Sequence, residues 1–348
     1  MVRARASLVV LLMVTGCLET KRPGAGLPAS PPEGSCGAPI EPGPRRDLVL
    51  GGRAAQQDGA RLVFSERDAD GRLVLGVLGP INEDSGLNLL ALGRYRAYFA
   101  ERKVDAIVVT GDVGEDPHRI SRVLGELALS GVPVLVVIGN TESRADFAEG
   151  LREAQKRFPN IVDLTGVRTV QFPELSLVSL PGYFDPAFVK AKGSCLYSQA
   201  MIDEVMNEAK RLGAPVGLVT HGPPKGQGTQ AIDWARTLNA GDPAMTLAIS
   251  SADIRFGFFS NIKEAGGHAT KDAAGAAPLK EGEPSSTLFL NPGPADTTPW
   301  EMNDHTRSFG MASLFTLEGN QASYEVFRLG PPTAAEKAEA KGLEAQPR

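Results

Sequence analysis

The chain has 348 residues, of which 42% are hydrophobic and 22% are charged, and this is the composition of a globular protein with a packed core. Its formal net charge of -5 and its lack of a dense lysine and arginine block exclude the electrostatic footprint of a nucleic-acid-binding protein, so we expect no nucleic-acid partner. The length alone leaves the number of domains open.

The first 17 residues have the layout of a secretory signal. Two arginines precede an apolar run that is too short to cross a bilayer as a helix. The run ends in VTGC (residues 14–17), which resembles the bacterial lipobox, where the cysteine is acylated and cleavage falls just before it. The resemblance implies a lipoprotein signal peptide over residues 1–17 and a lipid anchor on Cys17. The alternative is an ordinary signal peptide cleaved elsewhere, so that Cys17 is lost.

Residues 18–46 are rich in Pro and Gly, and we expect them to form a semi-extended tether. A chain anchored through Cys17 would lie in the cell envelope, facing the periplasm or the outer surface. Leu18, which follows the anchor, favours the outer membrane by similarity to known sorting rules. Cys36 lies in the tether and Cys195 in the body; they could pair in an oxidising envelope, but two cysteines alone leave a disulfide open.

After the tether, residues 61–79 alternate in polarity around Asp70-Gly71, which predicts a hairpin. Amphipathic helical patterns then alternate with apolar strand patterns, a succession typical of βαβ units. The helices are expected over 89–103, 118–130 and 144–158, and the strands between them over 104–112 and 131–140.

The second half of the body contains shorter strand patterns and one clear helix. We expect residues 222–252 to be an irregular excursion over one face and residues 331–348 to be a charged tail, either disordered or a frayed helix, which leaves one domain over 47–330. The expected strands are 161–164, 168–172, 175–183, 214–222, 253–260 and 286–293, with a helix over 201–213 and a closing hairpin over 311–329.

Polar residues follow the buried strands at their carboxyl ends, where open α/β sheets place their ligands. Each such corner, taken alone, could be no more than a turn, because Gly, Asn and Asp are common turn formers. The corners are GPINED (79–84), GDVGED (111–116), GNTES (139–143), HGPP (221–224) and SNIKEAGG (260–267).

The order and spacing of these corners resemble the calcineurin-like metallophosphoesterase superfamily, whose motifs read D-x-H, G-D, G-N-H-[ED], H and G-H-x-H. The resemblance covers about residues 72 to 330 and implies an α/β fold, a four-layer α/β/β/α sandwich with two mixed sheets. It also implies two divalent metal ions, which share a bridging carboxylate and acidify the water between them.

Three positions of the motif set are intact. By the resemblance, Asp112 matches the bridging carboxylate, Asn140 the amide ligand and His221 an imidazole ligand. Considered by itself, His221 could instead be a hydrogen-bonded core histidine. Asp112 could serve as the N-cap of the helix that starts near Pro117, with or without a ligand role.

The remaining motif positions carry other residue types. Pro80 and Asn82 replace the Asp and His of the first motif, Thr141 replaces the catalytic His, and Asn261 and Lys263 replace the two His of the last motif. The first metal site is therefore lost, because proline has no side-chain donor and a protonated lysine repels a cation. Asp112, Asn140, His221 and Asn261 leave a residual second site for none or one weakly bound divalent metal ion.

Lys263 is expected to replace part of the lost metal charge by pairing with Asp112. Acidic residues near the corners could supply replacement oxygens, although such loop residues are usually solvated. Two further histidines match no motif position and are expected at the surface. The acidic candidates are Glu83, Asp84, Glu115 and Asp116, and the unmatched histidines are His268 and His305.

These observations favour a membrane-anchored pseudoenzyme that binds or scaffolds. Its expected partners are the lipid bilayer, through Cys17, and a phosphate-containing ligand or an envelope protein. One alternative is an active metal-dependent phosphoesterase that cleaves a phosphate mono- or diester with an atypical mononuclear site. Another is a protein that only presents its surface loops to a partner in the envelope.

Overall fold

The computed structural model describes residues 36–66, 70–213 and 215–344. The expected signal peptide, Cys17 and the tether as far as residue 35 lie outside these ranges. Within the described residues, no helix combines the length and the apolar character needed to cross a membrane.

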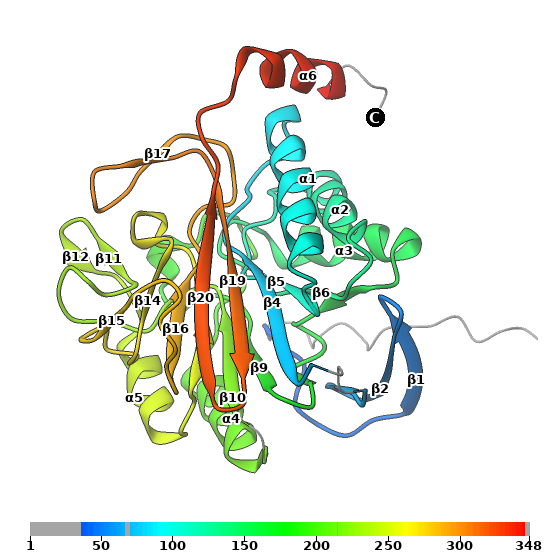
Figure 1. Cartoon of the computed structure of the whole chain (residues 1–348). Helices are drawn as coiled ribbons and strands as arrows, with labels where there is room; N and C mark the ends of the chain where they lie inside the picture. Colours follow the sequence, from blue (N-terminus) through cyan, green and yellow to red (C-terminus); the bar gives the residue numbers. More distant parts are fainter. Residues whose placement is uncertain (1–35, 67–69, 214, 345–348) are drawn as a thin grey trace, which may run out of the picture.

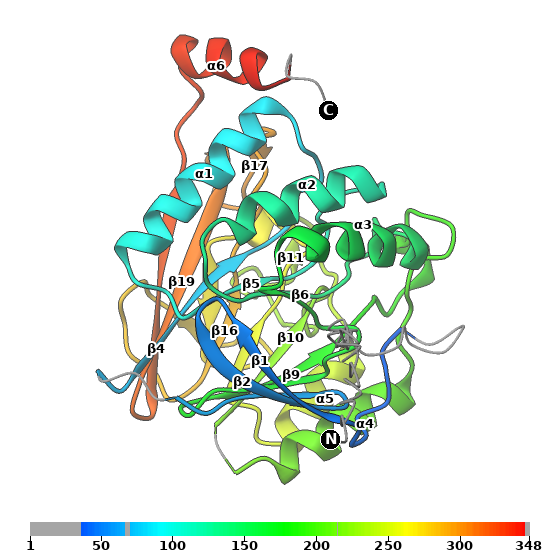
Figure 2. The same ribbon diagram turned by 90° about the vertical axis from the view of Figure 1, so that its right-hand side faces the viewer.

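The first of the two large sheets has six strands in the order β20-β19-β4-β5-β6-β7. Neighbours from β4 to β7 run parallel, while β19 is antiparallel to both β4 and β20. Figure 2 shows α1, α2 and α3 together on the outer side of this sheet. The strands are β4 (Arg72–Leu78), β5 (Ala106–Val109), β6 (Val134–Val136), β7 (Ile161–Asp163), β19 (Met311–Glu318) and β20 (Gln321–Arg328), and the helices are α1 (Gly86–Glu101), α2 (Pro117–Ala128) and α3 (Arg144–Arg157).

The second sheet has ten strands in the order β1-β2-β3-β8-β9-β10-β13-β16-β14-β15. Its centre, β9-β10-β13-β16, is parallel. Helices α4 (Gln199–Arg211) and α5 (Pro243–Ser251) lie on its outer side (Figure 1). The strands are β1 (Arg45–Leu50), β2 (Arg53–Asp58), β3 (Arg61–Phe64), β8 (Thr169–Gln171), β9 (Ser176–Leu180), β10 (Val216–Thr220), β13 (Phe256–Phe258), β14 (His268–Thr270), β15 (Pro278–Leu279) and β16 (Leu288–Asn291).

The apolar residues fall into three clusters that separate four layers. In β4, Leu75 and Val77 point into the cluster between the two sheets, while Val74 and Leu78 point toward α1 and α2. A third cluster joins α4 and α5 to the outer face of the ten-stranded sheet. Strands covered on both faces read as continuous apolar runs, which explains the sequence pattern of β4 to β6. The expected α/β/β/α sandwich with two mixed sheets is confirmed.

The hairpin expected over residues 61–79 is wrong. β3 belongs to the ten-stranded sheet and pairs with β2 and β8, whereas β4 is central in the other sheet and pairs with β5 and β19. The Asp70-Gly71 turn therefore leads from one sheet to the other. A strand that is apolar on both faces gains more by entering the sandwich than by pairing with its neighbour in sequence.

Both ends of the described chain are more ordered than expected. Cys36 and Ile40 are buried, so the chain packs on the body well before β1 begins at Arg45. The tail, expected to be disordered or a frayed helix, contains α6 (Ala334–Glu344), which lies over the end of α1 (Figure 1). Glu344 Oε1 accepts a hydrogen bond from the backbone N–H of Gly86 at 3.0 Å, and Ala340 is buried. Residues 222–252, expected to be irregular, contain α5.

Candidate functional site

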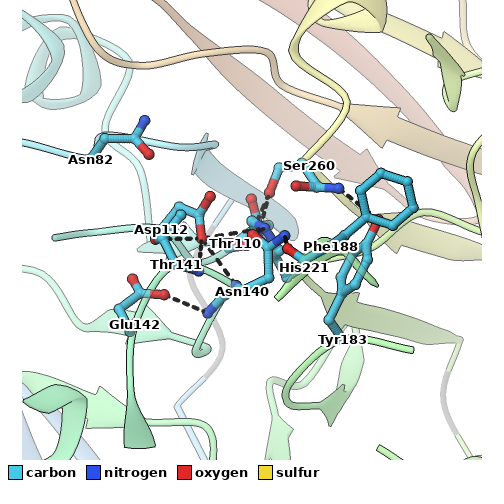
Figure 3. A network of polar contacts seen from close by, with 12 residues as sticks. Asn82, Thr110, Asp112, Asn140, Thr141, Glu142, Tyr183, Phe188, His221 and Ser260 are labelled. Carbon is cyan, nitrogen blue, oxygen red and sulfur yellow. Dashed lines mark hydrogen bonds and ion pairs between the residues drawn. The ribbon is translucent and has the colours of Figure 1, made fainter. Parts of the chain in front are cut away.

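The polar corners come together where parallel strands of the two facing sheets end. Asp112, Asn140 and His221 follow β5, β6 and β10, and their side chains form one buried network (Figure 3). Asp112 has a left-handed backbone with φ of 59°, a conformation that Asp and Asn tolerate better than other non-glycine residues. The sequence prediction that these three residues meet is consistent with this geometry.

Asp112 is held by donors from the GNTES corner. Its Oδ1 atom accepts hydrogen bonds from the backbone N–H groups of Asn140 and Thr141, both at 3.1 Å, and from Thr141 Oγ1 at 2.8 Å. Gly139 permits this approach, because a Cβ there would lie 2.2 Å from Asp112 Oδ1. Thr141, at the position of the family's catalytic His, thus donates to the carboxylate itself.

His221 is fully buried, and both of its ring nitrogens face oxygen acceptors. Nδ1 lies 2.7 Å from the carbonyl oxygen of Thr110, and Nε2 lies 3.0 Å from Asn140 Oδ1 and 3.4 Å from Asp112 Oδ1. The Asn140 amide donates its N–H to the carbonyl of Phe188 at 2.7 Å, which leaves its oxygen toward the ring. The imidazolium form satisfies both contacts, whereas a metal ligand must offer an unprotonated nitrogen.

The electrostatics of the pair agree with this arrangement. Burial disfavours the charged form of both side chains. Even so, the charge of His221 and the hydrogen bonds from His221 and Thr141 hold the pKa of Asp112 well below its usual value. The Asp112 carboxylate in turn raises the pKa of His221 above its ordinary value against the opposing effect of burial. A buried cation and a buried anion therefore neutralise each other at the former metal position.

Glu142 is a member of this site that the sequence reasoning did not single out. Its carboxyl is buried and accepts hydrogen bonds from the backbone N–H groups of Val113 at 2.5 Å and Gly139 at 3.0 Å. Burial, together with the nearby charge of Asp112, raises the pKa of Glu142 to about 8. The acidic position that ends the family motif G-N-H-[ED] was the signal that could have identified it.

Lys263 does not pair with Asp112, so that expectation is wrong. Its Nζ atom donates to Oδ2 of Asp296 at 2.8 Å and lies 5.0 Å from the centre of the Trp300 ring. Asn82 Nδ2 donates to the same oxygen, also at 2.8 Å. The side chain of Asp296 is 2% exposed, so the ammonium and the amide compensate a buried carboxylate.

Pro80 explains why Asp296 occupies this place. The carbonyl oxygen of Pro80 accepts the backbone N–H groups of Ala295 at 2.8 Å and Asp296 at 3.2 Å, which fastens that segment against the first corner. Pro80 and Asn82 thus both bind the segment that contains Asp296. The carboxylate of Asp296 is in turn the counter-charge of Lys263. Asp296 matched no motif, and the sequence offered no signal for it.

Asn261 faces away from the Asp112 network. Its Nδ2 atom donates to the hydroxyl of Tyr183 at 2.6 Å, and the Tyr183 ring stands edge-on to His221 with ring centres 6.0 Å apart. Ser260 is the member of the SNIKEAGG corner that reaches the histidine, since its hydroxyl lies 3.1 Å from Nδ1 of His221 and donates to the carbonyl of Thr110.

The acidic residues considered as replacement ligands have other contacts. Asp116, and not Asp112, is the N-cap of α2, where it accepts the backbone N–H of Arg119 at 3.0 Å. The other three interact with nearby polar or basic side chains, and the two unmatched histidines also lie apart from the network. These contacts are Asp84 with Arg122, Glu115 with Arg119, Glu83 with Ser85, and His268 with the carbonyl of Gln230, while His305 is exposed.

The residues present do not fit the two-metal centre that the sequence resemblance implies. Within residues 36–66, 70–213 and 215–344, no group of three or more His, Cys, Asp or Glu side chains is arranged to hold a metal ion. At one position the ammonium of Lys263 takes the place of a cation, and at the other the would-be ligands hydrogen-bond to one another. Beside Lys263, a groove of about 550 Å³ is lined by residues such as Arg236, Glu264, Asn303 and Arg307.

Two sheets packed face to face, helices outside them and polar corners at the strand ends define an α/β/β/α sandwich, the architecture that the resemblance of the corners implies. One solved structure matches this chain with 15% sequence identity and a TM-score of 0.52. The match covers 73% of this chain and 98% of the chain in that structure. This match supports the same overall fold in the two proteins. At identities this low the likeness shows the fold alone.

Other solved structures match less closely. A dimetal phosphatase from Danio rerio has 15% identity and a TM-score of 0.46, with 75% of this chain and 99% of that chain covered. A phosphatase from Mycoplasma pneumoniae has 10% identity and a TM-score of 0.45, with coverages of 77% and 96%. No protein-family model matches the sequence, and neither does any curated protein.

Proposed function

We propose that this protein is a non-catalytic binding or scaffold protein that keeps the metallophosphoesterase fold. The observation that carries the proposal is that residues aligned with metal ligands of the family are paired with the chain's own charges. His221 neutralises Asp112 in one cluster, and Lys263 neutralises Asp296 in the other. Each cluster is complete without a cation, so a metal ion would have to break a buried ion pair in order to bind.

The residues that would carry out hydrolysis are also replaced. A phosphoesterase of this fold needs a nucleophile made from metal-bound water, and the ligands for the first metal are replaced by Pro80, Asn82 and Lys263. Thr141 cannot take or give a proton as an imidazole does near neutral pH. Loss of a single preorganised donor in an active site typically costs about 10²- to 10³-fold in rate, and here several are replaced.

The proposed place of action is the cell envelope. The lipobox-like VTGC sequence at residues 14–17 and the Pro/Gly-rich segment after it support a lipid anchor on Cys17 followed by a tether. We further propose that the anchored domain offers the groove beside Lys263 to a phosphate-containing ligand or to another envelope protein. The arginines and acids along the groove, with Asn303, suit a polar partner.

Metal content and hydrolysis test the catalytic part of the proposal. The full chain, purified in detergent, is incubated with Mn²⁺, Zn²⁺ or Fe²⁺, dialysed and analysed by mass spectrometry of metals, and then assayed with aryl phosphate mono- and diesters. We expect far less than one metal ion per chain and a rate equal to that of a Thr141→Ala control. Turnover that is lost in Asp112→Asn and His221→Ala variants would establish the alternative, an active phosphoesterase with an atypical mononuclear site.

Membrane fractionation tests the anchor separately. Cys17→Ser should release the protein from the membrane fraction or block its processing, whereas Cys36→Ser, which leaves the lipobox intact, should not. Unchanged membrane association of the Cys17→Ser variant would reject the lipid anchor without bearing on the catalytic question.

A further inference from the structure

Two buried cysteines from distant parts of the sequence lie side by side near the entry of the chain into the fold. Cys36 is 4% exposed and Cys195 is 3% exposed, and both belong to the apolar cluster that includes α1 to α3. The Cys36 thiol donates to the carbonyl oxygen of Leu196 at 2.9 Å across a sequence separation of 160 residues. Leu196 directly follows Cys195 in the chain, so this hydrogen bond brings the Cys36 sulfur next to Cys195.

The backbone on both sides of this pair is already fixed. Next to Cys36, the N–H of Ala38 donates to the carbonyl of Thr165 at 2.8 Å, and the carbonyl of Ala38 accepts from Arg168 at 2.9 Å. Next to Cys195, its own carbonyl accepts the N–H of Tyr183 at 3.0 Å. Both segments are therefore held in place, with the Cys36 sulfur hydrogen-bonded to the residue that follows Cys195.

We propose that Cys36 and Cys195 form a disulfide in the mature protein. The oxidant is a disulfide-bearing reagent, either a thiol–disulfide oxidoreductase or a low-molecular-weight disulfide. The thiolate of Cys195 attacks one sulfur of the oxidant, which gives a mixed disulfide and expels one thiolate. The thiolate of Cys36 then attacks the Cys195 sulfur and expels the second thiolate, so two protons leave the protein and two electrons reduce the oxidant.

The burial of both sulfurs places this reaction during folding, before the segment around Cys36 has closed over the body. The bland alternative is that the two thiols stay reduced and act as small apolar residues, as buried cysteines often do.

The bridge would fasten the N-terminal segment to the loop that holds the polar site. That loop supplies the Phe188 carbonyl, which orients the Asn140 amide, and the Tyr183 hydroxyl, which binds Asn261. Tension on the chain that precedes Cys36 would then be borne by Cys195 and would not reach β1 (Arg45–Leu50). This inference is independent of the proposed function, since an active enzyme could carry the same bridge.

Peptide mapping tests the bond directly. The full chain is isolated from its own envelope fraction, treated with iodoacetamide under denaturing conditions and digested with trypsin without reductant. We expect the peptides spanning residues 22–45 and 193–210 to appear linked, and to separate when a reductant is added. Carbamidomethylation of both cysteines in the unreduced, denatured protein would overturn the proposal.

Thermal unfolding gives a second readout that does not depend on the source of the protein. Chain unfolded and refolded in the presence of oxidised glutathione should unfold about 5–10 °C higher than chain refolded in excess reductant. The Cys36→Ser/Cys195→Ser variant should unfold at the temperature of the reduced chain under both conditions. A melting temperature that does not respond to reductant in the unsubstituted chain, or linkage of either cysteine to glutathione only, would contradict the proposal.

Discussion

The pair between Lys263 and Asp296 gives the sharpest test of the idea that the chain's own charges replace a metal. In the Lys263→Ala variant, the Asp296 carboxylate, whose side chain is 2% exposed, would keep only the hydrogen bonds from Asn82 and the Thr298 backbone. Removing one partner of a buried ion pair typically costs about 3–5 kcal/mol, because the remaining charge is left uncompensated. Loss of the contact with Trp300 adds about 0.5–2 kcal/mol.

A double-mutant cycle separates the pair from other effects of truncating Lys263. Urea unfolding followed by circular dichroism gives the free energy of unfolding of the unsubstituted chain, Lys263→Ala, Asp296→Asn and the double variant. We expect the double variant to recover about 2–3 kcal/mol relative to the sum of the single changes, since it removes both charges together. The exposed pair of Lys271 and Glu283 is the matched control, with an expected coupling energy close to zero.

A second cycle asks whether Asp112 shares the ammonium. Lys263→Ala and Asp112→Asn should be much closer to additive than Lys263→Ala and Asp296→Asn, because His221 provides the counter-charge of Asp112. A coupling energy near zero between Lys263 and Asp296, or a larger one between Lys263 and Asp112, would refute the reasoning.

Two further predictions concern the packing of α6 and the response to acid. Gly86→Ala should loosen α6 and speed trypsin cleavage at Lys337 and Lys341, because the added Cβ would lie 2.1 Å from the carbonyl oxygen of Ala340. Gly93→Ala is the control in the same helix: its added Cβ meets only the end of a side chain at 3.8 Å, so cleavage should be unchanged. Burial lowers the pKa of His268, so the unfolded chain binds its proton first and the contribution of His268 to stability should fall as the pH drops below about 6.5, against the opposite contribution of Glu142, whose pKa is raised. His268→Gln should flatten this loss in pH-dependent urea unfolding, whereas the same change at exposed His305 should not; an unchanged acid limb would contradict the assignment.

The strands and helices around the site could be predicted because each is encoded by a pattern within its own segment of the sequence. Apolar runs of four to seven residues gave β4, β5 and β10, and helical periodicity gave α2 and α3, since strands buried on both faces and amphipathic helices have distinct patterns. Hairpin pairing was predicted wrongly at β3 and β4, because pairing depends on which sheet each strand enters and not on the turn between them.

The resemblance of the corners to a known motif set predicted that Asp112, Asn140 and His221 would meet, which the hydrogen bonds among them bear out; that Pro80, Asn82 and Lys263 hold no metal stays a prediction. These conclusions follow from residue type and order along the chain. The motif set carried no information about residues outside it. Glu142 could have been identified from the acidic position that ends the G-N-H-[ED] motif, whereas no motif position pointed to Asp296.

Only the tertiary structure determined the partner of Lys263. The carbonyl of Pro80 holds the backbone of Asp296 against the first corner, more than 200 positions away in the sequence, and so a buried carboxylate lies within 2.8 Å of the ammonium. The same applies to Cys36, which reaches Cys195 only because the chain before β1 packs on the body. A side chain's residue type fixes its charge and its donors, but the approach of distant segments decides which opposite charge is near enough to offset the cost of burial.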